Sequence, residues 1–236
     1  KRQVHGWGAA CVYMRFGELG IGYLRTSLPL LEEDVKRFVM AVPRDVQWIH
    51  VVMHSRLTVS EPINVFNSHP FYVDNPGGVS LWLVHNGSVD KRVLAEKLDM
   101  VGLVERYADS FFLAHWIARN IDRVDVDAVS AALKSVVDLG AVKTALNCAG
   151  ILIDSRSSEV ASFSANFSVV EDIKQKRYYQ LYLVTPSQRT AIATSSTVAY
   201  YLETMFSWQI TPLENGEIVF TTAKDKSIHI ERKKFL

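Results

Sequence analysis

The chain has 236 residues, 48% of them hydrophobic, so it can form one large domain or two small ones around a substantial core. Its 26 Lys and Arg residues against 25 Asp and Glu residues leave a net charge of +1, so no chain-wide field exists to hold nucleic acid or an anionic membrane. We therefore expect no nucleic-acid partner and no membrane, and a small neutral or zwitterionic ligand fits better.

The first third of the chain reads as strands separated by one helix and one long loop. Residues 6–16 and 47–56 are apolar runs typical of buried strands, and residues 30–42 have the apolar spacing and acidic first turn of a helix. Residues 60–78 have the composition of an ordered loop, and residues 79–85 read as another buried strand.

The rest of the chain turns helical and then returns to strands. Apolar residues three and four apart predict helices over 89–98, 109–121 and 126–139. Short β-branched and aromatic runs then predict strands over 147–155, 159–167, 177–186, 190–196 and 216–222. The basic end at 231–236 reads as a solvated tail. Without a repeat or linker, residues 1–236 are expected to form one α+β domain of two packed sheets with helices outside.

The two cysteines, Cys11 and Cys148, each lie inside an apolar run and do not make a disulfide framework. We expect both to be small buried hydrophobes in a reducing, cytoplasmic protein. The longest apolar stretch, 136–153, is interrupted by Asp138 and Lys143, which argues against a membrane span.

Asn86 and Gly87 follow the strand expected at 79–85. An Asn-Gly pair between apolar runs favours a hairpin turn, but Ser88 suits the N-cap of the helix expected at 89–98. We therefore predict a strand-to-helix corner. Such a corner exposes backbone N–H groups that can stabilise an oxyanion, and the Asn86 amide could add a second donor.

Five short motifs follow one another in order. They are HGWGAA at 5–10, MHSRLTV at 53–59, NSHPF at 67–71, VHNGS at 84–88 and ADS at 108–110. Together they resemble the class II glutamine amidotransferase domain, and most closely its small stand-alone members. This family is an N-terminal-nucleophile (Ntn) hydrolase, so the resemblance implies an αββα sandwich of two mainly antiparallel sheets with helices outside.

The resemblance also implies roles for four residues. Arg56 would clamp the carboxylate of glutamine, which suits its bidentate fork. Asn86 and the Gly87 N–H would form the oxyanion hole, and Asp109 would bind the α-ammonium group. No cofactor or metal is implied. Taken singly, Arg56 also reads as a strand-end cation and Asp109 as a helix cap.

The nucleophile of this family is a cysteine at the start of the mature chain, whereas this sequence starts with Lys1. Neither Cys11 nor Cys148 has a free amine beside it. We expect the first strand and its cysteine to lie in an upstream segment absent from this sequence. The complete protein would then hydrolyse the side-chain amide of glutamine or a γ-glutamyl compound, as a glutaminase that acts alone, as a homo-oligomer or with a synthase partner. The alternative is a catalytically inactive glutamine-binding or interaction module.

A metal enzyme is the competing hypothesis, because histidines are frequent between residues 50 and 115. His50 and His54 have the spacing that binds zinc on a helix, but here the spacing falls on an expected strand. Four residues at ~3.3 Å each separate such side chains by roughly 13 Å, too far for one zinc ion. The sequence therefore predicts no metal site.

Overall fold

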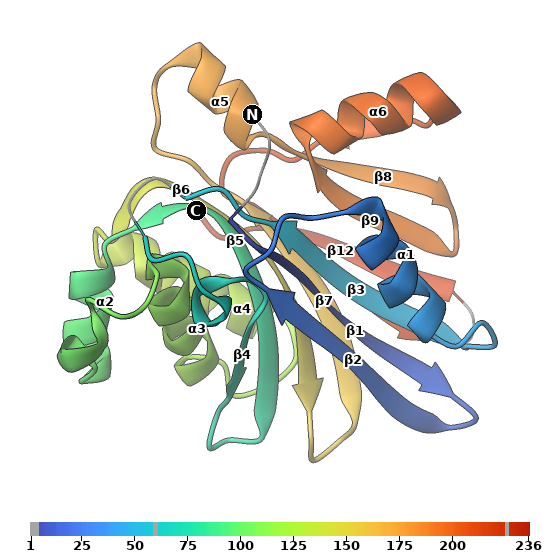
Figure 1. Cartoon of the computed structure of the whole chain (residues 1–236), viewed down its shortest axis with the longest axis horizontal. Helices are drawn as coiled ribbons and strands as arrows, with labels where there is room; N and C mark the ends of the chain where they lie inside the picture. The colour runs from blue at the N-terminus through green and yellow to red at the C-terminus, as the bar shows by residue number, and fades with distance from the viewer. Residues whose placement is uncertain (1–4, 59–60, 225–226) are drawn as a thin grey trace.

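The computed structural model describes residues 5–58, 61–224 and 227–236, so the expectations that concern Lys1 lie outside the described residues. The chain folds into layers of sheet and helix (Figure 1). The strands are β1 (Trp7–Arg15), β2 (Glu18–Thr26), β3 (Trp48–Ser55), β4 (Phe71–Asp74), β5 (Val79–Val89), β6 (Val142–Asp154), β7 (Glu159–Asn166), β8 (Leu181–Ser187), β9 (Thr190–Ser195), β10 (Ile210–Pro212), β11 (Glu217–Lys224) and β12 (Ser227–Lys234). The helices are α1 (Glu32–Ala41), α2 (Lys91–Leu98), α3 (Asp109–Arg119), α4 (Val126–Asp138), α5 (Ile173–Tyr179) and α6 (Ser196–Phe206), with 3-10 turns η1 (Val65–Asn67) and η2 (Val101–Leu103).

The centre of the fold is a six-stranded antiparallel sheet in the order β12-β11-β7-β6-β5-β4. Helices α2, α3 and α4 cover one face of it, and the main core lies between that face and these helices. Phe112, Leu113 and Leu133 are fully buried there, because the helices direct one apolar stripe at the apolar side of the alternating strands. The three helices expected in the middle of the chain are confirmed.

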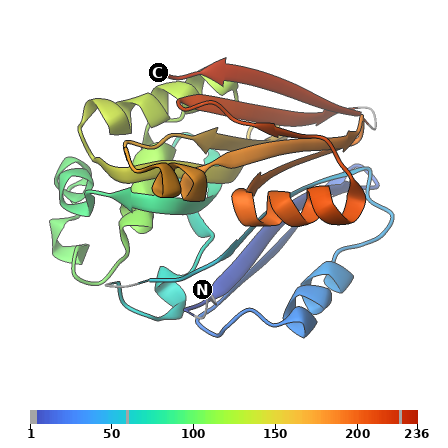
Figure 2. The same cartoon turned by 90° about the horizontal axis from the view of Figure 1, so that it is seen from above.

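Two three-stranded sheets lie on the other side of the molecule, in the orders β2-β1-β3 and β10-β8-β9. Val12 and Val52 of the first small sheet pack against Trp82 and Ile151 of the six-stranded sheet, which makes a second core between the sheets. Helix α1 lies outside β1–β3, and α6 lies against β8 and β9, as Figure 2 shows from above. The expected sandwich with helices outside is therefore confirmed, with its second sheet divided into two.

Several sequence predictions differ from the structure, and one of them is the loop predicted at 60–78, which contains strand β4. Residues 177–186 were expected as one strand, but α5 continues to Tyr179 because Asp172 caps it by accepting hydrogen bonds from Lys174 N and Gln175 N. The basic end at 231–236 is not a solvated tail, since β12 pairs with β11 as far as Lys234. Strands β2 and β10 and helix α6 were not predicted at all.

None of the helices within the described ranges is both long enough and apolar enough to cross a membrane.

Candidate active site

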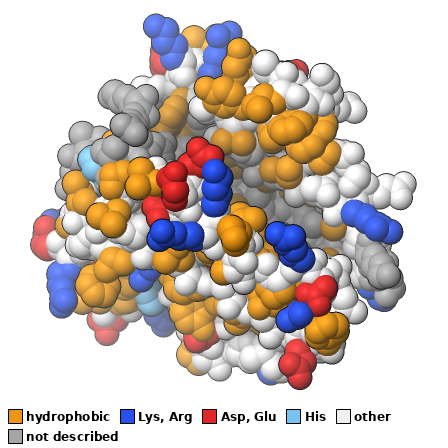
Figure 3. All heavy atoms as spheres, turned by 45° about the vertical axis from the view of Figure 1, so that its right-hand side comes forward, with side chains coloured by type: hydrophobic (Ala, Val, Ile, Leu, Met, Phe, Trp, Pro, Cys, Tyr) orange, Lys and Arg blue, Asp and Glu red, His pale blue; other side chains and the backbone are white. Residues whose placement is uncertain are grey.

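A cavity of about 1840 Å³ lies between the layers, and Arg56, Asn86, Gly87 and Asp109 all line it. These four residues come from the end of β3, from β5 and from the first residue of α3. Figure 3 shows the hollow beside the exposed hydrophobic side chains of α6. The tertiary structure thus brings to one cavity four residues that are spread over more than fifty positions in the sequence.

Gly87 lies in a β-bulge within β5, where the pairing with β6 shifts between Gly87 and Val89. Its φ is 158°, and a Cβ at this position would lie 2.0 Å from the carbonyl oxygen of Ala145. Any side chain would therefore collide with the backbone of β6. Only glycine fits this position without movement of the neighbouring strand.

The Gly87 N–H points away from β6. Ser155 N donates to Gly78 O, so the antiparallel register directs the backbone of even-numbered β5 residues toward β6 and that of odd-numbered residues toward β4. Strand β4 pairs with β5 only as far as Leu83. The register thus leaves the Gly87 N–H without a partner among the described residues, and it is available as a donor.

The predicted strand-to-helix corner is wrong at this point. Strand β5 continues through Asn86 and Gly87 to Val89, and the next helix begins at Lys91. Its N-cap is Asp90, which accepts hydrogen bonds from Arg92 N and Val93 N, rather than Ser88. The carboxylate of Asp90 is the stronger cap, and the bulge keeps the chain extended up to it. The free donor at Gly87 therefore comes from a strand bulge and not from a helix N-terminus.

The side chain of Asn86 lies beside Tyr178 of α5. Burial raises the pKa of Tyr178, Tyr179 adds to the rise, and a hydrogen bond from the Asn86 side chain opposes it. Helix α5 is held over β6 because Asn147, the cross-strand partner of Asn86, donates from its side chain to Tyr179 O. Tyr178 was missed by the sequence analysis, because its position was read as part of a strand.

Arg56 follows β3 directly and is 4% exposed. Its Nη1 donates to Pro62 O at 3.3 Å. Burial lowers the pKa of the Arg56 guanidinium, while the carboxylates of Glu61 and then Asp109 oppose this change. Glu61, which no sequence motif indicated, is itself held by Lys91 Nζ at 3.1 Å. Arg56 is therefore a buried cation with two carboxylates nearby and no direct ion pair among the described residues, and it can accept an anionic ligand.

Asp109 is the first residue of α3, and Ala108 takes the N-cap position. Asp109 Oδ2 accepts a hydrogen bond from Val89 N at 2.9 Å, and Asp109 Oδ1 accepts one from Ser110 N at 2.7 Å. The carboxylate thus ties the end of the β5 bulge to α3. Oδ1 also accepts from Ser110 Oγ at 3.1 Å, whereas Oδ2 accepts from Val89 N alone among the described residues, so Oδ2 keeps a lone pair for a cation in the cavity.

Three histidines, the half-buried His54 and the buried His69 and His85, line the cavity beside these residues. The rings of His54 and His69 lie 4.2 Å apart, and burial lowers the pKa of His54 to about 4 and that of His69 well below its ordinary value. His85 Nε2 lies 3.1 Å from Ala145 O, an acceptor, so Nε2 carries the proton and Nδ1 faces Ser110 Oγ at 2.9 Å. Burial lowers the pKa of all three imidazoles, so they are neutral at pH 7 and add no positive charge beside Arg56.

Both cysteines are free and buried in strands, Cys11 in β1 and Cys148 in β6. Burial raises the pKa of each thiol, so neither is a thiolate at neutral pH. Across the described ranges, no group of three or more His, Cys, Asp or Glu side chains is arranged to hold a metal ion. His50 and His54 lie on β3, the strand expected for them, and His50 instead contacts Ser162 Oγ at 2.9 Å.

Comparison with known proteins gives structural matches only. No protein-family model matches the chain, and no curated protein sequence matches it. The fold matches the structure of glutamine phosphoribosylpyrophosphate amidotransferase from B. subtilis in complex with ADP and GMP, with a TM-score of 0.61 and 17% identity. It also matches a structure described as the allosteric regulatory enzyme of purine biosynthesis, with a TM-score of 0.62 and 16% identity.

Each match covers 99% of this chain and 44% of the other, so this chain spans less than half the length of those proteins. At 16–17% identity these matches show the fold alone, and they agree with the αββα sandwich that the resemblance of the five motifs implied.

Proposed function

We propose that this chain is a class II glutamine amidotransferase domain that binds glutamine or a γ-glutamyl compound and, with an N-terminal cysteine, hydrolyses its side-chain amide. The observation that carries the proposal is the free Gly87 N–H on the same cavity as Asn86, Arg56 and Asp109. Acyl transfer from the side chain of an amino acid needs a donor for the oxyanion, a cation for the α-carboxylate and a carboxylate for the α-ammonium group.

Each group has a separate task in this proposal. The guanidinium of Arg56 binds the substrate α-carboxylate, and Asp109 binds the α-ammonium group. These charges lie away from the reacting carbon, so they hold ground state and transition state alike. The Gly87 N–H and the Asn86 amide donate to the carbonyl oxygen as it gains charge, which lowers the barrier to thiol attack.

The nucleophile in this proposal is an N-terminal cysteine outside the 236-residue sequence. Its thiolate attacks the side-chain carbon, ammonia or an amine leaves with a proton, and water then cleaves the thioester to give the γ-carboxylate. Buried Cys11 and Cys148 cannot take this part. That observation also supports the second candidate, a glutamine-binding module without catalysis. A reducing cytoplasm suits both free thiols, and the ammonia could pass to a synthase domain or a second subunit.

The test compares the chain preceded by its natural upstream segment with the 236-residue chain alone. Ammonia release from glutamine and from a γ-glutamyl peptide is measured for both, with the first cysteine changed to serine as the matched control. Turnover only with the cysteine present supports the hydrolase. Glutamine binding without turnover in every protein supports the binding module, and the absence of both binding and turnover refutes the proposal.

A further inference from the structure

Asn86 and Asn147 form a cross-strand pair on the cavity wall. Side chains alternate along β5, and Trp82 and Val84 point into the core between the sheets, so Asn86 points to the same side. Asn147 lies directly opposite on β6 and lines the same cavity. The two side-chain amides therefore lie next to each other on one face of the six-stranded sheet.

Asn147 and Thr144 fasten the end of helix α5 to strand β6. Asn147 is 2% exposed; its Nδ2 donates to Tyr179 O, and its Oδ1 accepts from Phe167 N at 3.0 Å. The hydroxyl of Tyr179 donates to Thr144 Oγ1 at 3.2 Å. Main chain and side chain of Tyr179 are thus both bonded to β6, so this end of α5 has a fixed place above the asparagine pair.

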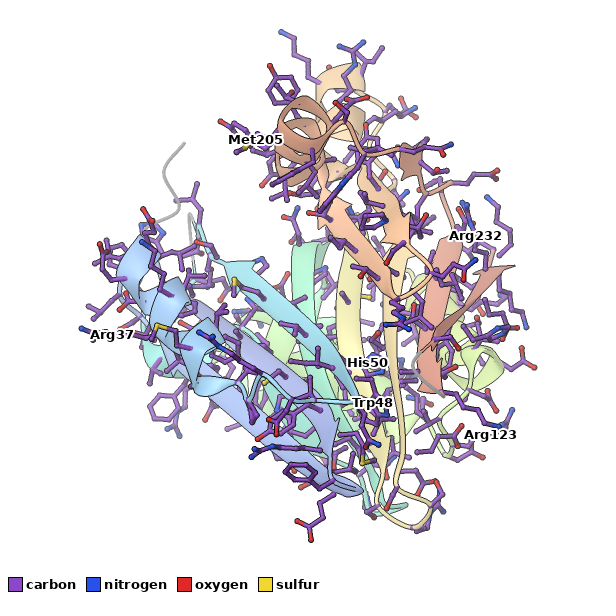
Figure 4. The ribbon with its side chains drawn as sticks, turned by 90° about the vertical axis from the view of Figure 1, so that its right-hand side faces the viewer. Arg37, Trp48, His50, Arg123, Met205 and Arg232 are labelled. Atoms are coloured by element: carbon purple, nitrogen blue, oxygen red, sulfur yellow. The ribbon has the colours of Figure 1, made fainter. Side chains whose placement is uncertain are left out.

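Tyr178 precedes the anchored residue and lines the cavity with Asn86. Its ring packs edge-on against that of Tyr179, with the centroids 5.0 Å apart. The Asn86 side chain donates to the phenolic oxygen of Tyr178, which opposes the rise that burial causes in the pKa of this tyrosine. Figure 4 shows α5 and α6 side by side at one end of the molecule, away from Trp48 and His50.

The contact with Tyr178 decides which end of the Asn86 amide faces a ligand. An asparagine side chain can present either its oxygen or its NH2 group. The oxygen would repel a substrate carbonyl oxygen, whereas the NH2 group would donate to it. One N–H bonded to Tyr178 fixes the amide plane and leaves the second N–H for the cavity. A donor held in this way needs no reorganisation when the carbonyl oxygen gains charge.

We propose that Tyr178 is a positioning residue, whose hydroxyl holds the Asn86 amide with one N–H directed at the substrate carbonyl oxygen. This inference rests on the proposed function, in which Asn86 is an oxyanion donor. Tyr178 itself does not touch the reacting atoms and acts through Asn86. Its side chain is 55% exposed, so it contributes little to the core and the hydroxyl can be removed without loss of the fold.

The first experiment is Tyr178→Phe in the chain preceded by its natural upstream segment. We expect kcat for ammonia release from glutamine to fall about fivefold to tenfold, the effect of one neutral hydrogen bond. KM should change less than about twofold, because the oxyanion donor acts mainly in the transition state. Tyr201→Phe on α6 is the matched control: Tyr201 is 58% exposed, lies outside the cavity lining and should leave both constants unchanged.

The second experiment repeats Tyr178→Phe in an Asn86→Ala background. If Tyr178 acts through Asn86, its hydroxyl has nothing left to hold, and kcat should change less than about 1.5-fold between the two proteins. A direct contact of Tyr178 with substrate, or a general loss of packing, would keep the full effect. Equal losses in the two backgrounds, or an effect on KM alone, would overturn the proposal.

The third measurement needs no turnover. The side-chain NH2 signals of Asn86 in the 15N-1H NMR spectrum are assigned by their loss in Asn86→Ala. We expect both signals to shift in Tyr178→Phe and to stay in place in Tyr201→Phe; unmoved signals in Tyr178→Phe would overturn the proposal. A protein that carries the cysteine and releases no ammonia would instead contradict the proposed function, and these signals would still decide whether Tyr178 holds the amide.

Discussion

Replacing Gly87 with alanine tests the bulge on which the proposed oxyanion hole depends. The added Cβ would lie 2.0 Å from Ala145 O, 2.7 Å from Ala145 C and 2.9 Å from His85 Nε2, and two of these atoms are backbone. Overpacking of this kind costs about 1–3 kcal/mol, and holding alanine at a φ of 158° costs about 1–3 kcal/mol more. We therefore expect Gly87→Ala to lower the free energy of unfolding by about 3 kcal/mol.

The measurement is urea unfolding followed by fluorescence and circular dichroism, together with thermal unfolding. For a domain of this size, about 3 kcal/mol corresponds to a fall in Tm of roughly 6–12 °C. Gly102→Ala is the matched control, because a Cβ there meets nothing within 4 Å and no positive φ has to be kept. Helix propensity in the short turn η2 would, if anything, favour alanine.

A Gly87→Ala protein as stable as Gly102→Ala, within about 0.5 kcal/mol, would refute the reasoning. Ala145 would then not lie against the bulge, and the direction of the Gly87 N–H would lose its support. If stability falls as expected, the NMR shifts of the β5 and β6 amides should change most around the two residues that collide.

Other consequences follow from the same site. In the protein with an N-terminal cysteine, Asn86→Ala should lower kcat about 100-fold in the ammonia assay, typical for one lost oxyanion donor, and an unchanged kcat would remove Asn86 from the mechanism. Arg56→Ala should raise KM and weaken glutamine binding by calorimetry, whereas Arg37→Ala on the outer helix α1 should not, and equal effects would contradict the carboxylate clamp. Asp109→Asn should weaken binding of glutamine more than of an analogue that lacks the α-amine; equal losses would indicate a structural role only. Stability should fall as pH drops from 7.5 to 5.5, because His54 titrates near pH 4 when folded and about 6.5 when unfolded, so the unfolded chain takes up the proton first. His54→Phe should remove about 1 kcal/mol of that loss in urea unfolding, and an unchanged pH dependence would contradict the burial of this ring.

Local patterns in the sequence were sufficient for most helices and strands. The run at 126–139 repeats apolar residues at helical spacing after Asp125, and α4 begins directly after that cap. The same reasoning did not predict a helix over residues 196–206, because their β-branched and aromatic side chains do not define one apolar helix face. Helix α6 buries only Ala199, so its sequence shows little of the apolar periodicity that packing normally produces.

The five motifs and the fold family could be recognised from the sequence alone, because each motif is short and its residues are neighbours in the chain. The availability of the Gly87 N–H was decided by the register between β5 and β6 and by the early end of β4. The bond from Val89 N to Asp109, and the division of the second sheet beside an open β3 edge, likewise join segments far apart in the chain. Sequence periodicity reports which face of an element is apolar, whereas pairing register and strand neighbours depend on contacts that only the folded chain brings together.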